Sequence, residues 1–169
     1  LRVAQSVVQN NFAPLMKGLF SIVLIFFFIA AWGQEPVSDT VAAEYFYPNG
    51  IKSSEGFLVN KKPDGYWKTY HESGSLKSEG NRKNFQLDSL WRFYDESGVL
   101  TLEITYQNDK KNGPRTTFLS DGTVIENFLN DVKTGVTKTL DLKKRLVKSV
   151  PFFNGLEEGL ALSYDTLGT

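Results

Sequence analysis

Few residues in this sequence combine the types and the spacing that catalysis requires. His71 is the only histidine and there is no cysteine. A catalytic triad or a histidine general base would therefore depend on His71, and a thiolate nucleophile or a Cys-ligated metal is excluded. His71 occupies a sequence column that also holds Asp95, Leu119 and Asp165. Because this column accepts unrelated side chains, we interpret it as an exposed turn position, and we predict a protein without catalytic residues that is not an enzyme.

A column of carboxylates is the next candidate for chemistry. Glu55, Glu79 and Glu103 recur every 24 residues, and Glu126 continues the column after realignment. A calcium ion needs six to eight converging oxygens, whereas carboxylates two strands apart in a sheet lie about 9.6 Å from each other. We therefore predict no metal site and no cofactor, and we expect these carboxylates to pair with cations on neighbouring strands. The expected cationic partners are Lys52, Lys68, Lys77 and Arg92.

Aromatic side chains are the strongest candidates for a binding surface. A stripe of aromatics along a sheet binds sugar rings or peptide side chains, or it packs as core, since each large aromatic buries about 150–250 Å². Side chains alternate along a strand, so Trp67 and Thr69 should point away from Tyr66 and Tyr70, and one face can pack while the other binds. The candidate binding face consists of Tyr66, Trp67, Tyr70, Trp91, Phe93 and Tyr94.

These candidates are positioned by an internal repeat. One aromatic column recurs at spacings of 24, 24, 24, 22 and 24 residues. A fixed period of this kind indicates an array in which each unit buries its apolar surface against its neighbours. We predict an all-β fold, an elongated antiparallel meander of about five stacked β-hairpin units of 24 residues in an open single-layer sheet, ending in a partial sixth unit. The column reads Phe46, Tyr70, Tyr94, Phe118, Leu140 and Tyr164.

Each unit carries two predicted turns, separated by strands such as residues 66–70 and 90–94. The first turn ends in a glycine, which can take the positive φ of a tight reversal. The second is a loop that runs from an Asn to a Gly or Ser five residues later, with Pro63 and Pro114 in or beside it. The predicted turn glycines are Gly50, Gly65, Gly74, Gly98, Gly113, Gly122, Gly135 and Gly159.

Residues 47–67 (YPNGIKSSEGFLVNKKPDGYW) and 70–81 (YHESGSLKSEGN) resemble the bacterial MORN-repeat variant. The resemblance covers residues 45–117 and weakens afterwards. It implies an elongated sheet of stacked hairpins with a binding or scaffolding role. Related bacterial proteins are described as antitoxin-like, a cytoplasmic role that the N-terminal sequence argues against. In the last three units the tryptophan column is lost, since it reads Trp67, Trp91, Arg115, Thr137 and Ala161.

The N-terminal residues are typical of an export signal. Met16 and Lys17 precede an apolar run that ends in small residues. The 14 residues from Leu19 to Trp32, apolar except for Ser21, would span as a helix only about 21 Å of the roughly 30 Å hydrocarbon core. A retained membrane anchor is the alternative interpretation. We assign residues 1–15 to an upstream extension, 16–33 to a signal peptide, 34–44 to a linker and 45–169 to the array. No cysteine is present for lipid attachment, so we expect a periplasmic or secreted protein.

Charge narrows the expected partners. Residues from Gln34 onward carry 17 basic and 19 acidic side chains, which gives no basic surface for nucleic acid. We expect a non-catalytic exported module that binds an unknown protein or surface polymer through a sheet face or edge, and that self-associates through its C-terminal edge. The alternative is a structural module on the envelope or on lipid headgroups, contacted through Lys61 and Lys62 and through residues 143–145. Other membrane contact would need an uncleaved signal segment.

Processing is the first testable expectation. Ala31 and Gly33 occupy the positions that signal peptidases require to be small, so cleavage should follow Gly33 and leave Gln34 as the new N-terminus. Mass spectrometry of the N-terminal peptide from the exported protein checks this. A membrane-bound product that keeps Met16 would contradict the expectation.

Overall fold

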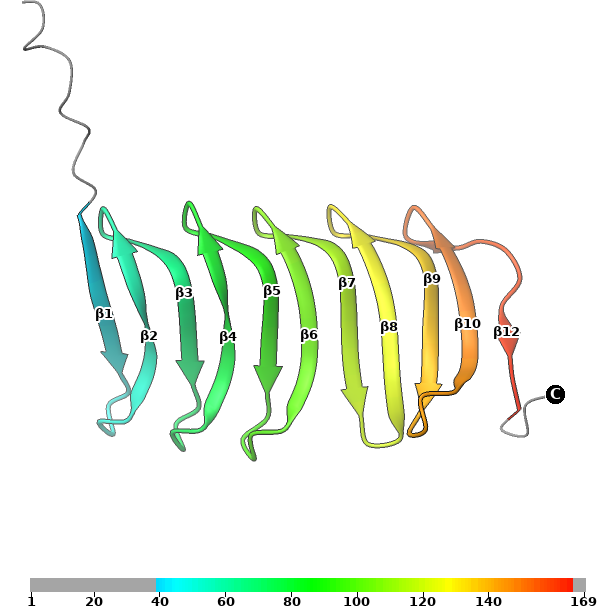
Figure 1. Ribbon diagram of the computed structural model, residues 1–169, viewed down its shortest axis with the longest axis horizontal. Coiled ribbons are helices and arrows are strands. Elements are labelled where there is room, and N and C mark those ends of the chain that lie inside the picture. The colour runs from blue at the N-terminus through cyan, green and yellow to red at the C-terminus, as the bar shows by residue number, and fades with distance from the viewer. Residues whose placement is uncertain (1–38, 166–169) are drawn as a thin grey trace, which may run out of the picture. The chain divides into compact units, whose positions relative to one another are not determined.

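Residues 39–165, described in the computed structural model, form one open antiparallel sheet (Figure 1). Neighbouring strands are consecutive in the sequence from β1 to β11, and β12 pairs with β10. The predicted all-β meander of hairpins is thereby confirmed.

The predicted extension and signal peptide lie outside the described residues. A search of residues 39–165 finds no helix with the length and hydrophobicity of a membrane span.

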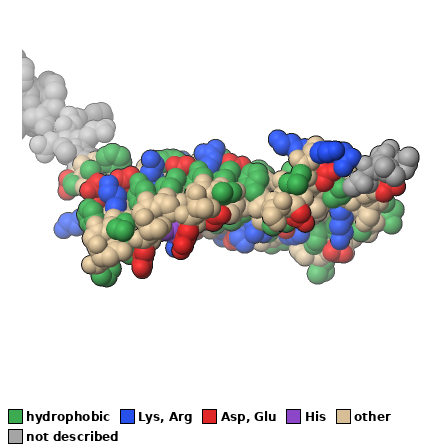
Figure 2. Space-filling model, turned by 90° about the horizontal axis from the view of Figure 1, so that it is seen from below, with side chains coloured by type: hydrophobic (Ala, Val, Ile, Leu, Met, Phe, Trp, Pro, Cys, Tyr) green, Lys and Arg blue, Asp and Glu red, His purple; other side chains and the backbone are tan. Residues whose placement is uncertain are grey.

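Ten long strands make up most of the sheet, and Figure 2 shows it as a single layer seen from one end of the strands. Two short strands, β11 (Leu156–Glu157) and β12 (Leu162–Ser163), lie beside β10. The long strands are β1 (Thr40–Phe46), β2 (Lys52–Val59), β3 (Lys62–Tyr70), β4 (Leu76–Lys83), β5 (Gln86–Tyr94), β6 (Leu100–Gln107), β7 (Lys110–Leu119), β8 (Gly122–Leu129), β9 (Val132–Asp141) and β10 (Leu146–Phe153).

Turns at one end of the strands contain the predicted positive-φ glycines. Gly50, Gly74 and Gly98 have φ of 83°, 88° and 83°, and the amide of each donates to the carbonyl three residues earlier at 2.9–3.0 Å. Lys144 takes the same conformation, with φ of 61°, in the β9–β10 turn. There the Asp141 carboxylate accepts from the Lys143 and Arg145 amides at 2.9 Å, which holds the turn without a glycine.

Reversals at the other end are tighter than the sequence suggested. Asn60 and Lys61 have φ of 51° and 65° and alone connect β2 to β3, which is the geometry of a two-residue type I′ turn. The same pair of left-handed residues follows β4, β6, β8 and β10. The predicted five-residue Asn-to-Gly loop is therefore wrong, because Asn tolerates the left-handed region well enough to begin the reversal itself.

In three units the glycine that follows the Asn turn bends a strand instead of closing a loop, whereas Gly159 lies between β11 and β12. Gly65, Gly113 and Gly135 lie inside β3, β7 and β9 with positive φ. In β3 the pairing jumps from Glu55–Lys68 to Phe57–Asp64, so extra residues oppose Gly56 in a bulge. The bulge keeps the strand paired on both sides of the bend. Pro63 and Pro114, expected in or beside loops, consequently lie within β3 and β7.

Two other expectations are corrected. Gly122 begins β8 without positive φ, and it is needed because a Cβ there would overlap the Leu140 carbonyl oxygen. Residues 40–44, assigned to a linker, belong to β1, where Thr40 pairs with Val59 and Glu44 pairs with Glu55. Because Ala42 and Ala43 are both small, the sequence of this edge strand shows no alternation of apolar and polar side chains. The strand is defined by its pairing with β2.

Buried indoles supply the core of this single layer. Trp67 and Trp91 retain 6% and 4% of their surface exposed, and Ile104 retains 2%. A Cβ at Gly56 would overlap the Trp67 ring, and one at Gly80 would overlap the Trp91 ring, so each indole lies flat on a glycine of the preceding strand. The ring nitrogens donate to the carbonyls of Phe57 and Asp64, both at 3.2 Å, and of Asn81 at 2.9 Å. Glycine and tryptophan are thus required together.

Stability should depend strongly on this contact. Trp91→Ala removes a buried indole between two formed units and should cost about 3–5 kcal/mol of unfolding free energy. Thr137→Ala, in the same repeat column, should cost far less, since the Thr137 hydroxyl is buried with no hydrogen-bond partner among the described residues. Urea denaturation of both variants checks the difference. Equal losses would contradict it.

Candidate functional site

The two faces of the sheet differ in chemistry. Residues directly paired across antiparallel strands lie on the same face. One row, which passes through Trp67, Gly80, Trp91 and Ile104, defines the tryptophan face. The adjacent row on the opposite face, here called the charged face, runs through Glu44, Glu55, Lys68, Glu79, Arg92 and Glu103.

The six aromatic candidates are divided between these faces. Trp67 and Trp91 are buried on the tryptophan face, where the Phe93 ring centroid lies 6.4 Å from that of Trp91. Tyr66, Tyr70 and Tyr94 lie on the charged face, as strand alternation predicted. The structure therefore does not bring the six together, and it makes the tryptophans core residues of the sheet.

Ion pairs order the charged face. The Lys52 ammonium contacts Glu44 at 2.5 Å and Glu55 at 2.8 Å, and the Arg92 guanidinium donates to Glu103 at 2.9 Å. Two of the expected cations, Lys52 and Arg92, are thus found beside carboxylates of the row. The Lys52 contact is the main reason that the pKa of the Glu55 carboxyl is lowered.

Tyrosines of the aromatic column tie successive hairpins to this row. The Tyr70 hydroxyl donates to Glu55 at 2.5 Å, and the Tyr94 hydroxyl donates to Glu79 at 2.8 Å. Each bond spans 15 residues of sequence and therefore links one unit to the next. Burial and the Glu55 hydrogen bond raise the pKa of Tyr70 to about 12, so the ring stays neutral and held in place.

His71 has a structural position at the turns. Its Nε2 lies 3.1 Å from the Tyr94 carbonyl oxygen, an acceptor, so Nε2 carries the proton. The Tyr47 hydroxyl makes the equivalent bond to the Tyr70 carbonyl at 2.7 Å. His71 is half-buried, not fully exposed as expected, because it bridges adjacent turns. Among the described residues, no group of three or more His, Asp or Glu is arranged to hold a metal ion.

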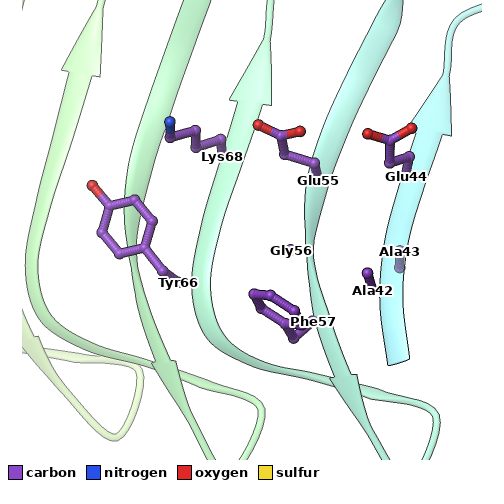
Figure 3. Close-up of a pocket in the computed structure, with 8 residues that line it drawn as sticks. All are labelled: Ala42, Ala43, Glu44, Glu55, Gly56, Phe57, Tyr66 and Lys68. Carbon is purple, nitrogen blue, oxygen red and sulfur yellow. The ribbon is translucent and has the colours of Figure 1, made fainter. Parts of the chain in front are cut away.

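A groove of about 310 Å³ opens on the charged face over β1, β2 and β3 (Figure 3). Phe57 and Tyr66 are 50% and 47% exposed, and in Figure 3 their rings lie on the same side of the sheet as the Glu55 and Lys68 side chains. Apolar rings beside charged groups can contact a ligand with both apolar and hydrogen-bonding parts. The groove is lined by Ala42, Ala43, Glu44, Glu55, Gly56, Phe57, Tyr66 and Lys68.

Of the residues that line the groove, the sequence pointed to Tyr66, Glu55 and Lys68, but not to Phe57 or to the residues of β1. Ala42 and Ala43 occupy the columns that hold Tyr66 and Trp67 one unit later. Ala42, which pairs with Phe57 on the charged face, leaves the space that a larger side chain would fill. The repeat shows the change from large aromatic residues to alanines at these two positions. The change indicates a groove only if residues 40–44 form a strand beside β2.

Comparison with protein families agrees with this geometry. Residues 63–84 and 87–108 match the MORN repeat variant. The chain contains MORN-variant repeats. The two matched segments are β3–β4 and β5–β6 with their turns, the units that carry Trp67 and Trp91. A comparison with curated proteins gives no significant match.

The raised pKa of Tyr70 predicts a loss of stability in alkali. In the unfolded chain the phenol loses its proton near pH 10.0, whereas in the folded sheet it does so at about 12. The folded state therefore holds the proton more tightly, and the contribution of Tyr70 is complete below pH 10 and lost as the pH rises toward 12. Urea midpoints measured from pH 8 to 11.5 should fall for the parent and fall less for Tyr70→Phe. Identical slopes would contradict the assignment.

Proposed function

We propose that this protein is a non-catalytic, exported binding module that contacts a protein or a surface polymer through its charged face. The observation that carries the proposal is the groove over β1, β2 and β3, where Phe57 and Tyr66 stay half exposed although the sheet buries two tryptophans nearby. Apolar side chains that are exposed next to one another, as these two rings are in the groove, are typical of an interaction site. Its partner would pack on these rings and meet Glu55 and Lys68 beside them.

The sheet supplies a rigid base for such contacts. Trp67, on the opposite side of β3 from Tyr66, is packed on Gly56 and hydrogen-bonded to two carbonyls. The Tyr70 and Glu55 pair holds the adjacent row. A surface that is ordered before binding loses less conformational entropy when a partner docks, which favours affinity without catalysis.

Attachment to anionic lipid is the second candidate, and one observation favours it. Figure 2 shows basic side chains gathered near the C-terminal strands, where residues 143–145 lie in the β9–β10 turn. However, Arg145 is paired with Asp141 at 2.7 Å. Lys61 and Lys62 lie at the opposite end of the strands (Figure 1), so the two basic segments do not form one surface. The groove is the better-supported site.

A matched pair of variants tests the proposed function. Phe57→Ser with Tyr66→Ser removes the two rings of the groove, while Leu129→Ser with Val136→Ser removes exposed apolar residues on β8 and β9. The exported protein and both variants are assayed for co-sedimentation with isolated cell-wall polymer, for retention on immobilised envelope proteins, and for binding to anionic vesicles.

The groove variant should lose at least tenfold in binding to the polymer or to the envelope proteins, and the control variant should bind as the parent does. Equal binding by all three would refute the groove as the site. Binding to vesicles that falls steeply with salt, and that is lost on Lys143→Ser with Lys144→Ser, would favour the lipid-attached alternative.

A further inference from the structure

The outer edge of β1 is a long backbone edge without a paired strand among residues 39–165. The Asn60 amide donates to the Asp39 carbonyl at 3.0 Å, so Asp39 and Asn60 form a hydrogen-bonded pair between β1 and β2. Hydrogen-bonded pairs alternate in an antiparallel ladder, so Val41, Ala43 and Tyr45 direct their backbone groups toward β2. Thr40, Ala42, Glu44 and Phe46 therefore present N–H and C=O groups outward, ready to pair with another strand.

We propose that this edge pairs with the same edge of a second copy, antiparallel and centred on Ala43. Two-fold symmetry then places Ala43 opposite Ala43 of the second copy as a non-hydrogen-bonded pair. Ala42 faces Glu44 of the second copy, and Thr40 faces its Phe46. These four residues carry the outward backbone groups. In this register, the outward N–H and C=O groups of each copy are therefore hydrogen-bonded to those of the other copy.

Side chains agree with the same register. Val41 and Tyr45, which are 50% and 49% exposed on the tryptophan face, become direct cross-strand partners, and an aromatic opposite a β-branched residue is a favourable pair. On the charged face, each Glu44 lies opposite an alanine, and its carboxylate is already paired with Lys52. No like charges are brought face to face. The small Ala43 pair avoids a clash at the symmetry axis.

The C-terminal edge offers a less complete template. Its last long strand, β10, already pairs with β11 and β12, each of two residues. The segment between them belongs to no strand, although the Glu158 amide donates to the Pro151 carbonyl at 3.1 Å, and it includes Gly159 with φ of 111°. A regular ladder cannot run through that interruption. The continuous strand β1 is the better surface for a second copy, and this inference stands independently of the proposed ligand groove.

Cysteine cross-linking tests the register, because the chain contains no other cysteine. Across a non-hydrogen-bonded pair the Cα atoms lie about 4.5 Å apart, within the range for a disulfide, so Ala43→Cys should form covalent dimers rapidly under mild oxidation. Ala42→Cys places its two Cα atoms about 8 Å apart, two residues out of register, and should cross-link at least tenfold more slowly. Equal rates, or faster linking at position 42, would overturn the proposed register.

Light scattering of the full chain, expressed so that processing takes place in the cell, tests the edge itself. Ala42→Pro removes an outward N–H while leaving the bonds to β2, so it should abolish a dimer that the parent forms and retain the parent's circular dichroism. Leu160→Lys with Leu162→Lys alters the C-terminal edge and should leave the dimer intact. A monomeric parent at all concentrations, or a dimer that survives Ala42→Pro and is lost in the lysine variant, would refute the proposal.

Discussion

The contact on which the rest of this sheet depends is an indole ring lying on a glycine of the neighbouring strand. A single-layer sheet has no second layer to cover its apolar side chains, so burial has to be achieved within the layer itself. Trp67 on Gly56 and Trp91 on Gly80 reach near-complete burial in this way. Their ring nitrogens bond to backbone carbonyls at the bulges, so the same side chain fills the core and fixes the bend of the strand.

Loss of the tryptophan column in later units follows from this contact. Ile104 stands in the column of Gly56 and Gly80, and it pairs with Arg115 where a tryptophan would otherwise lie. An isoleucine side chain removes the flat surface that the indole needs. Arg115 instead reaches Glu126 at 2.8 Å, so the array continues with an ionic contact in place of an aromatic one. The glycine and tryptophan positions therefore change together on paired strands, and a different contact takes the place of the original one.

Packing on one face also shapes the other. With the tryptophans committed to one side, the charged face is left for ion pairs, tyrosine–carboxylate bonds and a few exposed rings. The hydrogen bonds from Tyr70 to Glu55 and from Tyr94 to Glu79 repeat from unit to unit, which couples each hairpin to the next. The groove forms where this pattern stops, because on the charged face of β1 Ala42 stands in the column that holds Tyr66 one unit later.

The sequence by itself determined the period, the hairpin meander, the positive-φ glycines at one set of turns and the alternation that separates Trp67 from Tyr66. These follow from local chemistry repeated at a fixed spacing. Only the tertiary structure decided that β1 belongs to the sheet, that Gly65 bends a strand rather than closing a loop, and that Gly122 is needed for close approach. Each of these depends on the neighbouring strand, whose position a repeat pattern does not specify. The groove could not be predicted for the same reason, since an alanine on β1 leaves a space only beside the particular residues of the strand with which it pairs.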